Sequence, residues 1–392
     1  MVQLASALAV GLLGLTAAVS AHPGHDVRAE AAERASFLKN AKVHQRSLAQ
    51  CASKLKARGH ENANVARRAN RVKAIRQKRG LQHSAHFHKA RSLTSILNTD
   101  HNSTLVGVSP STDPSVLFGS ESTCILGPDV TQGPYYVTGE LIRENIVEDQ
   151  EGVPLYMDIQ LINTNTCEPI PDIYTDLWHC NSTGVYSGIV ASGNGESSDE
   201  ANIDTTWLRG IQPSDKNGVV YMESIFPGHY TSRATHIHVL THPVNETTVN
   251  ANGTISGLYS SSSSHVGQIF FDQDLITEVE KTAPYNTNTQ DVTTNANDSI
   301  LSEEADTIDP FMEYVYLGDS VSDGIFAWIS MGMDPTVDTT VTPAAYYTED
   351  GGVENESSGS GMGGGGGMGG GSPPGQSGSS TTTAAAGRRT TV

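Results

Sequence analysis

The sequence predicts a mainly β protein, in which residues 120–347 form an antiparallel β-sandwich or a related barrel. Short segments in this region alternate apolar and polar residues, or gather β-branched and aromatic ones, and turn residues separate them. No helical stripe alternates with these segments, so a βαβ architecture is not expected. The flanking regions predict an N-terminal helical segment and a disordered C-terminal tail. The predicted strands are 153–163, 173–181, 218–226, 236–242 and 265–271, and one short helix is predicted at 274–281.

The chain begins with the features of a secretory signal peptide. Residues 1–21 form an apolar run that ends in the small residues "A-V-S-A", which suit cleavage after Ala21. The run lacks a positive charge near its start, and it is short for a membrane anchor, which is the alternative. No other stretch is long and apolar enough to predict a membrane span. Six Asn-x-Ser/Thr motifs agree with a secreted, extracellular glycoprotein; they begin at Asn102, Asn181, Asn245, Asn252, Asn297 and Asn355.

A basic segment follows the signal peptide. Residues 22–91 hold 17 Lys and Arg against 4 Asp and Glu, although the whole chain has a formal net charge of −19. The segment is rich in Ala, Leu, Lys and Arg, which predicts helices over 28–57 and 61–78 with a break at Gly59. Opposite charge favours a helical arm packed on the acidic body. Its "Q-K-R-G" ending leaves a removable pro-segment open, and the lack of interleaved aromatic residues argues against nucleic-acid binding.

The remaining segments are a predicted linker and a predicted tail. Residues 92–119 show little pattern, and residues 348–392 are rich in Gly, Ser and Thr and cannot bury a core. Four cysteines in a secreted chain suggest two disulfides, with three possible connectivities. The favoured pairs are Cys167 with Cys180, which closes a short loop between strands, and Cys51 with Cys124, which ties the arm to the body.

Two histidines with strand spacing suggest a metal site. His236 and His238 are two residues apart, so a strand points both rings to the same face. His242 would complete a zinc trio, but it lies six residues from His236, about 20 Å along a straight strand. The phenol oxygens of Tyr230 and Tyr186 are alternative ligands. Phenolate is a hard anionic donor that suits ferric iron better than zinc.

Longer motifs around these residues resemble the intradiol ring-cleavage dioxygenases, and in particular the secreted fungal branch of that family. The signature is a Tyr, a long gap, and then Tyr, Arg, His and His at fixed offsets. The resemblance covers roughly residues 120–345. The motifs are "G-P-Y-Y-V" (133–137), "D-L-W-H-C-N-S-T-G-V-Y-S" (176–187), "T-W-L-R-G" (206–210) and "I-F-P-G-H-Y-T-S-R-A-T-H-I-H-V" (225–239).

The resemblance implies a non-haem Fe(III) enzyme that cleaves catechol-type rings between the two hydroxyls with O2, giving cis,cis-muconate-type products. It also implies a possible homodimer through the N-terminal helices. Carried over position by position, the iron ligands are Tyr186, Tyr230, His236 and His238. Arg233 and Gln268 are the residues that act on the substrate together with Tyr230, and Pro134 and Tyr135 line the pocket.

Other observations limit these expectations. His179 and His229 are expected to be structural, and His265 is expected to lie in a loop. Only five Lys or Arg residues lie between positions 92 and 387, which favours an uncharged catechol as the substrate. The alternative hypothesis is a secreted, non-catalytic β-sandwich glycoprotein that binds a cell wall or surface.

Overall fold

A computed structural model of the chain describes the central domain and part of the basic arm. The predicted signal peptide, the linker at 92–119 and residues 356–392 of the predicted tail lie outside the described residues. The described residues are 48–81, 123–125, 133–191, 194, 198–242, 247–257, 265–305, 309–337 and 341–355. No helix in these ranges has the length and apolar character that a membrane span needs.

Two large sheets form the centre of the domain, which confirms the mainly β fold class. The first sheet contains β1 (Thr123–Ile125), β12 (Ile325–Met333), β3 (Pro154–Asn163) and β6 (Val219–Ile225) in that order, and β11 (Glu313–Tyr316) also pairs with β12. The second sheet contains β10 (His265–Phe270), β7 (His236–His242), β4 (Tyr174–Trp178) and β5 (Arg209–Pro213). The five predicted strands correspond to β3, β4, β6, β7 and β10.

Strand β12 makes the first sheet mixed, whereas an antiparallel sandwich was expected. It runs parallel to β3 along its whole length and parallel to β1 at its end. Every residue of β12 is buried, because the other sheet covers one face and the arm covers the other. A strand buried on both faces does not alternate apolar and polar residues, which is why the periodicity did not identify it.

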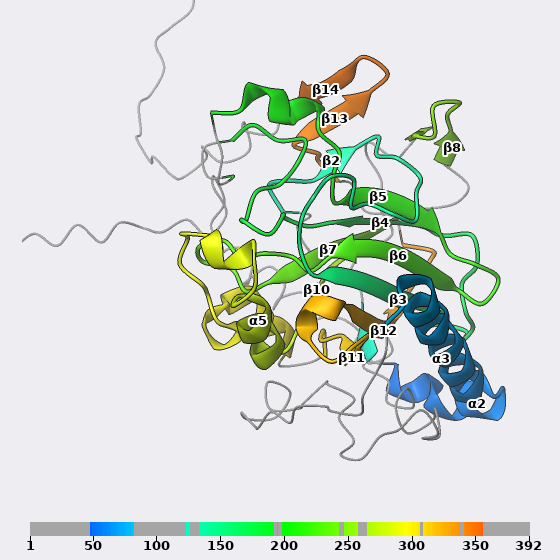
Figure 1. Ribbon diagram of the computed structural model, residues 1–392. Coiled ribbons are helices and arrows are strands. Elements are labelled where there is room, and N and C mark those ends of the chain that lie inside the picture. Colours follow the sequence, from blue (N-terminus) through cyan, green and yellow to red (C-terminus); the bar gives the residue numbers. More distant parts are fainter. Residues whose placement is uncertain are drawn as a thin grey trace, which may run out of the picture.

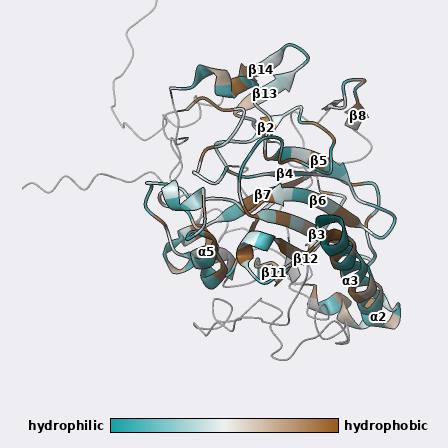
Figure 2. Cartoon of the chain, in the orientation of Figure 1, coloured by the Kyte–Doolittle hydropathy of each residue, from teal (hydrophilic) through white to brown (hydrophobic). Residues whose placement is uncertain are grey.

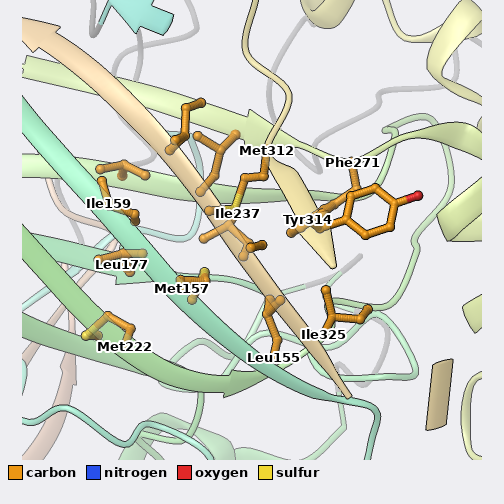
Figure 3. Packing of buried hydrophobic residues seen from close by; sticks show 14 of the residues in the cluster. Leu155, Met157, Ile159, Leu177, Met222, Ile237, Phe271, Met312, Tyr314 and Ile325 are labelled. Carbon is orange, nitrogen blue, oxygen red and sulfur yellow. The ribbon is translucent and has the colours of Figure 1, made fainter. Parts of the chain in front are cut away.

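The main core lies between the two sheets. In the first sheet, Leu155, Met157 and Ile159 of β3 are fully buried in this core. They meet Leu177 of β4 and Ile237 of β7, which come from the second sheet. Figure 3 shows these side chains converging between the ribbons. In β7 the odd-numbered residues therefore face the core, and the histidines at 236 and 238 face the opposite side of the sheet.

The basic arm packs on the outer face of the first sheet. Helix α2 (Ala52–Ala57) and helix α3 (His60–Arg79) are separated at Gly59, whose φ of 70° confirms the predicted break. Figure 1 shows α3, in dark blue, lying along β3. Val72 and Ile75 of α3 pack against Phe326 and Trp328 of β12. In Figure 2 the visible side of α3 is largely hydrophilic.

Charge attraction between arm and body is visible in the contacts of α3. Arg67 makes a two-pronged ion pair with Asp158, with N–O distances of 2.8 and 2.7 Å. Arg68 is fully buried 3.6 Å from the same carboxylate. Because Arg67 and Arg68 of the arm contact Asp158 in the same chain, the structure supports the prediction of an arm that folds back on its own domain. A homodimer through these helices stays a prediction.

The disulfide connects the arm to the body through a different cysteine from the predicted one. Cys51 pairs with Cys167, so the predicted pairs with Cys124 and Cys180 are wrong. Cys167 lies in the turn before β4, whereas Cys180 lies beyond the other end of that strand, which is about 16 Å long. Cys180 is a buried free thiol, and burial raises its pKa to about 12.

Loops and small elements form a third layer over the outer face of the second sheet. This layer buries Tyr135, Tyr186 and Tyr230 against Trp178 and Leu240 of that sheet. A three-stranded sheet of β14, β13 and β2 borders it. The remaining elements are β2 (Val137–Thr138), β8 (Thr247–Val249), β9 (Ile255–Gly257), β13 (Ala345–Thr348), β14 (Gly351–Glu354), α5 (Gln273–Val279) and α6 (Ser299–Ala305), with short 3-10 turns at Ala49–Cys51, Glu200–Asp204, Tyr285–Thr287, Asn295–Asn297 and Val321–Asp323.

Two sequence expectations need correction here. The β13–β14 hairpin extends to Glu354, so a disordered tail from residue 348 is wrong for the first residues of that region. His265 is the first residue of β10, and it is buried, so it does not lie in a loop. The predicted helix at 274–281 is found as α5.

Candidate metal centre

His236 and His238 of β7 lie side by side beneath the loop layer. Their Nε2 atoms are 3.1 Å apart, and both side chains are buried. The Nδ1 atom of His236 lies 2.6 Å from the Ala234 carbonyl oxygen, to which it donates its hydrogen. In the neutral ring this leaves a lone pair on Nε2. The ring of His238 stacks on Trp178 with a centroid separation of 4.8 Å, which fixes its plane.

Two tyrosine hydroxyls complete the cluster. The Tyr230 hydroxyl oxygen lies 3.2 Å from Nε2 of His236, and the Tyr186 hydroxyl oxygen lies 3.4 Å from that of Tyr230. Both tyrosines are buried. Burial raises the pKa of each phenol, and the neighbouring Tyr230 adds to the effect at Tyr186. Four donor atoms from three parts of the chain therefore form one continuous array.

The spacing of these four atoms fits a single bound cation. Donors that lie about 2.1 Å from one ion, at angles between about 90° and 110°, are separated by about 3.0–3.4 Å. The three successive distances, 3.4, 3.2 and 3.1 Å, all fall in this range. Nε2 of His236 also has a single lone pair but two polar neighbours within 3.2 Å. A cation at the centre would satisfy all four donors at once.

The donor set itself indicates the kind of cation. Within the described part of the chain, no three His, Cys, Asp or Glu side chains gather to hold a metal, so the array depends on its phenol oxygens. Two imidazoles and two phenolates suit a hard, highly charged ion. Such an ion also stabilises the phenolate form that burial disfavours.

Side-chain amides hold the loop that carries Tyr186. The backbone N–H of Tyr186 donates to Oδ1 of Asn194 at 2.7 Å, and Nδ2 of Asn194 returns a hydrogen bond to the Tyr186 carbonyl at 2.7 Å. Nδ2 of Asn202 donates to the same carbonyl at 2.8 Å. Just before this tyrosine, Gly184 has a φ of 83° and approaches the His229 carbonyl so closely that a Cβ would lie 2.3 Å from it. The chain therefore makes a tight turn at Gly184, just before Tyr186.

Arg233 and Gln268 lie beside the histidines and are bonded to each other. Arg233 is fully buried, and its Nη2 donates to Oε1 of Gln268. Gln268 is the register partner of His238 on the neighbouring strand β10, so both side chains share one face of the sheet. The structure thus brings both sequence-predicted residues next to the donor array.

The "G-P-Y-Y" segment covers the array from the other side. A Cβ on Gly133 would lie 3.2 Å from Cε1 of His238, so the absence of a side chain lets the backbone approach the ring. Tyr135 packs its ring 4.9 Å from that of Tyr186. Its hydroxyl is buried and makes no hydrogen bond to any described residue. Pro134, between them, is half-buried.

The remaining histidines lie outside the donor array. His179 bonds the Cys180 carbonyl and the Ser224 hydroxyl, and burial lowers its pKa to about 4. Burial alone would lower the pKa of His229, but the Glu280 carboxylate raises it above its ordinary value. Both arrangements agree with a structural role. His242 lies at the far end of β7, near Asp176, as the exclusion of a zinc trio requires.

The sequence reasoning did not find three residues that support the site. Asn194 and Asn202 hold the Tyr186 loop, and Asp298 contacts Arg233. Each acts through side-chain hydrogen bonds that leave no period or spacing in the sequence. What marks these residues is that their Asn or Asp side chains are buried, and the sequence does not show which loop residues are buried.

Comparisons with known proteins give a structural similarity. The chain matches no protein-family model and no curated protein sequence. An intradiol ring-cleavage dioxygenase from Tetranychus urticae aligns at 28% identity over 54% of this chain and 96% of its own, with a TM-score of 0.43. The dioxygenase domain of a dioxygenase–carbohydrate-binding protein fusion from Streptomyces sp. SirexAA-E aligns at 20% identity, covering 52% and 94% of the two chains, with a TM-score of 0.30.

A third solved structure with this similarity is hydroxyquinol 1,2-dioxygenase from Pseudomonas putida DLL-E4. It aligns at 14% identity over 54% of this chain and 67% of its own, with a TM-score of 0.33. With TM-scores below one half, these similarities do not by themselves carry an activity over to this chain. A function has to be argued from the donor array and its surroundings.

Proposed function

We propose that the chain is a non-haem Fe(III) dioxygenase that opens catechol-type rings between their two hydroxyl-bearing carbons. Its co-substrate is O2, and its products are of the cis,cis-muconate type. The observation that carries the proposal is the continuous array of two phenol oxygens and two imidazole nitrogens, whose neighbours are 3.1–3.4 Å apart. The motif resemblance supplies the reaction class.

Four side chains would hold the iron: Tyr186, Tyr230, His236 and His238. A ferric ion bound there would chelate both catechol oxygens and make the ring reactive towards O2. The protein's own contribution is geometry and charge. The strand fixes the two imidazoles, the amide-held loop fixes one phenolate, and the loop layer excludes water from the buried site.

Tyr230 is the residue that takes up a proton from the substrate. Its hydroxyl lies between the Tyr186 hydroxyl and Nε2 of His236, at the middle of the array. It is carried by the turn before β7, where Ser232 has a φ of 78°. A ligand on a turn has more freedom to move than one on a strand with neighbours on both sides. Tyr230 is therefore better placed than either histidine to leave the array as a catechol arrives.

Arg233 and Gln268 stabilise the negative charge that develops on the substrate. A guanidinium stays charged at every physiological pH, and its fixed donors require no reorganisation during the reaction. Pro134 and Tyr135 line the pocket opposite them. The buried hydroxyl of Tyr135 is available to bond a substrate oxygen.

The substrate proposed is an uncharged catechol. All five Lys and Arg residues between positions 92 and 387 lie in described parts of the chain. Arg143 pairs with Glu148, and Lys281 pairs with Glu278 at the surface. Arg209 bonds the Ser187 carbonyl, and Lys216 is exposed. This leaves Arg233 as the cation beside the donor array. Arg233 already forms an ion pair with Asp298, so the carboxylate of a charged substrate would have no cation of its own.

Secretion is also proposed. The Cys51–Cys167 disulfide is typical of proteins that fold in an oxidising compartment. The apolar leader and the Asn-x-Ser/Thr motifs point the same way.

The test of the proposed function is the colour and iron content of the purified protein. Ferric ion bound to phenolate has a visible charge-transfer band, so the iron-loaded protein should be burgundy, with one iron per chain, and should convert catechol with uptake of O2. Tyr186→Phe should lose most of the band. Tyr346→Phe, a half-buried tyrosine in β13, is the matched control and should keep it. Colourless protein after refolding with ferric iron would favour the alternative of a non-catalytic binding module.

A further inference from the structure

The guanidinium of Arg233 is anchored from behind by a distant acid. Its Nε donates to Oδ2 of Asp298 at 2.9 Å, and both side chains are fully buried. Its Nη2 donates on the other side to Gln268. The two bonds fix both the position and the plane of the group. Gln268 neighbours His238 across the sheet, so the fixed guanidinium lies beside the donor array.

The same carboxylate organises the backbone on both sides of the contact. Its Oδ2 also accepts the N–H of Ala234 at 2.8 Å. Its Oδ1 accepts the N–H groups of Ile300 and Leu301, at 2.8 and 3.1 Å, at the start of α6. Four donors therefore surround Asp298. One of them belongs to the residue whose carbonyl orients His236.

We propose that Asp298 is a positioning residue for the reaction: it aims the guanidinium of Arg233 at the substrate through Nε. The inference rests on the proposed function and deepens it. A free arginine side chain samples many rotamers, and an anchor at Nε removes that freedom before substrate arrives. Asp298 also makes Arg233 one half of an ion pair, so the pocket selects a neutral catechol over a carboxylated one.

The experiment is a double-mutant cycle on iron-loaded protein, with Asp298→Ser, Arg233→Met and the double variant. Serine can still accept the backbone N–H groups at the start of α6, but it is too short to reach Nε. Asp298→Ser should lower kcat/KM for catechol about a hundredfold, mainly through kcat, while the visible iron band persists. In the Arg233→Met background the same change should cost less than about twofold.

A multiplicative loss in the cycle would show that Asp298 acts independently of Arg233, and it would overturn the inference. Asp215→Ser is the control, because Asp215 accepts backbone N–H groups in a turn outside the donor array, and this variant should turn over catechol like the wild type. Arg233→Lys keeps Asp298 and tests the idea even if Asp298→Ser fails to fold. Lysine retains the charge but lacks Nε, so it should be as slow as Arg233→Met, and wild-type turnover would refute the anchor.

A second experiment tests selectivity and uses protocatechuate, a carboxylated catechol, as the probe. Asp298→Ser should raise the ratio of kcat/KM for protocatechuate to that for catechol, because it exposes an unpaired cation. An unchanged ratio would remove the selectivity part of the inference. Failure of the proposed function looks different: the wild-type protein itself would then bind no iron and cleave no catechol.

Discussion

His236 and His238 are carried by a strand with neighbours on both sides, whereas Tyr186 lies on a loop without regular secondary structure. Strand β7 is fixed by backbone hydrogen bonds to β4 and β10, which do not depend on any one side chain. The loop depends on two buried amides, Asn194 and Asn202. Both supports place a donor atom within 3.4 Å of the next. The comparison teaches that the same positional accuracy can depend on many weak contacts or on a few irreplaceable ones.

The largest expected effect, taking stability and turnover together, comes from removing one of those amides. Asn194→Ala leaves the buried N–H of Tyr186 without its acceptor and removes two bonds to carbonyl oxygens. The free energy of unfolding should fall by about 3 kcal/mol. The loop should also move enough to cost about a hundredfold in kcat and to shift the visible iron band. Urea unfolding and absorption spectra would measure both.

Two control variants sharpen this result. Asn286→Ala changes an exposed amide and should alter stability by less than about 0.5 kcal/mol. Ile237→Val lies between His236 and His238 of β7 and should cost about 1 kcal/mol through lost core packing, without changing the iron band. A band that moves with Ile237→Val but not with Asn194→Ala would reverse the comparison.

We call His236 and His238, with the strands that hold them, the strand half of the site, and Tyr186 with its supporting loop the loop half. The strand half could be predicted from sequence, and the loop half could not. Two histidines at strand spacing predict a shared face from period alone, and β7 bears this out. Tyr186 and Tyr230 were named as alternative ligands from the chemistry of phenolate, but only the motif resemblance assigned them to the site, because no local rule links Tyr186 to a strand 50 residues further along the chain. Asp298 lies 65 residues from Arg233, and side-chain contacts of that separation leave no pattern.

The same limit explains what was missed in the fold. Alternation of apolar and polar residues identified β3. It could not identify β12, which is buried on both faces, or its parallel pairing with β3. The Cys51–Cys167 pair was also out of reach, because the disulfide depends on which end of the first sheet the arm crosses.

The next largest effect concerns the support of the loop half between pH 4.5 and pH 8. Arg209 donates to the Ser187 carbonyl, next to Tyr186, and lies 3.8 Å from the buried Glu140 carboxyl. Burial raises the pKa of Glu140 to about 8, although Arg209 opposes this. The folded state therefore holds a proton that the unfolded state releases above its ordinary pKa near 4.5. The contribution of Glu140 to the free energy of unfolding is therefore fully present below pH 4.5 and is lost as the pH rises through about 8.

Glu140→Gln tests this dependence. Up to about 4 kcal/mol of unfolding free energy should be lost by the wild type between pH 4.5 and pH 8, relative to the glutamine variant. The variant keeps a neutral side chain of the same shape beside Arg209. Urea unfolding at a series of pH values gives the difference between the two curves. Parallel curves would show that Glu140 is ionised at neutral pH and that the loop half is not weakened by base.

The smallest effect concerns the strand half at acid pH, and it has the opposite sign. His179 follows β4 and joins the two sheets, because its Nε2 accepts from the Ser224 hydroxyl at 2.7 Å and its Nδ1 donates to the Cys180 carbonyl. Burial lowers the pKa of His179 from 6.5 to about 4. The unfolded state binds a proton that the folded state refuses, so stability is present above pH 6.5 and is lost as the pH falls through about 4.

The wild type should therefore lose about 3 kcal/mol between pH 6.5 and pH 4, relative to His179→Gln, which cannot take up a proton. The relative curve matters, because acidic residues elsewhere contribute equally to both proteins. Protonation of Nε2 also removes the acceptor for Ser224, so the link between the sheets should open before the rest of the domain. Hydrogen exchange at the end of β4 would detect that opening. If the protection factors there, which correct for the pH dependence of intrinsic exchange, are the same at pH 4.5 as at pH 7, the strand half does not depend on His179, and its stability comes from the sheet alone.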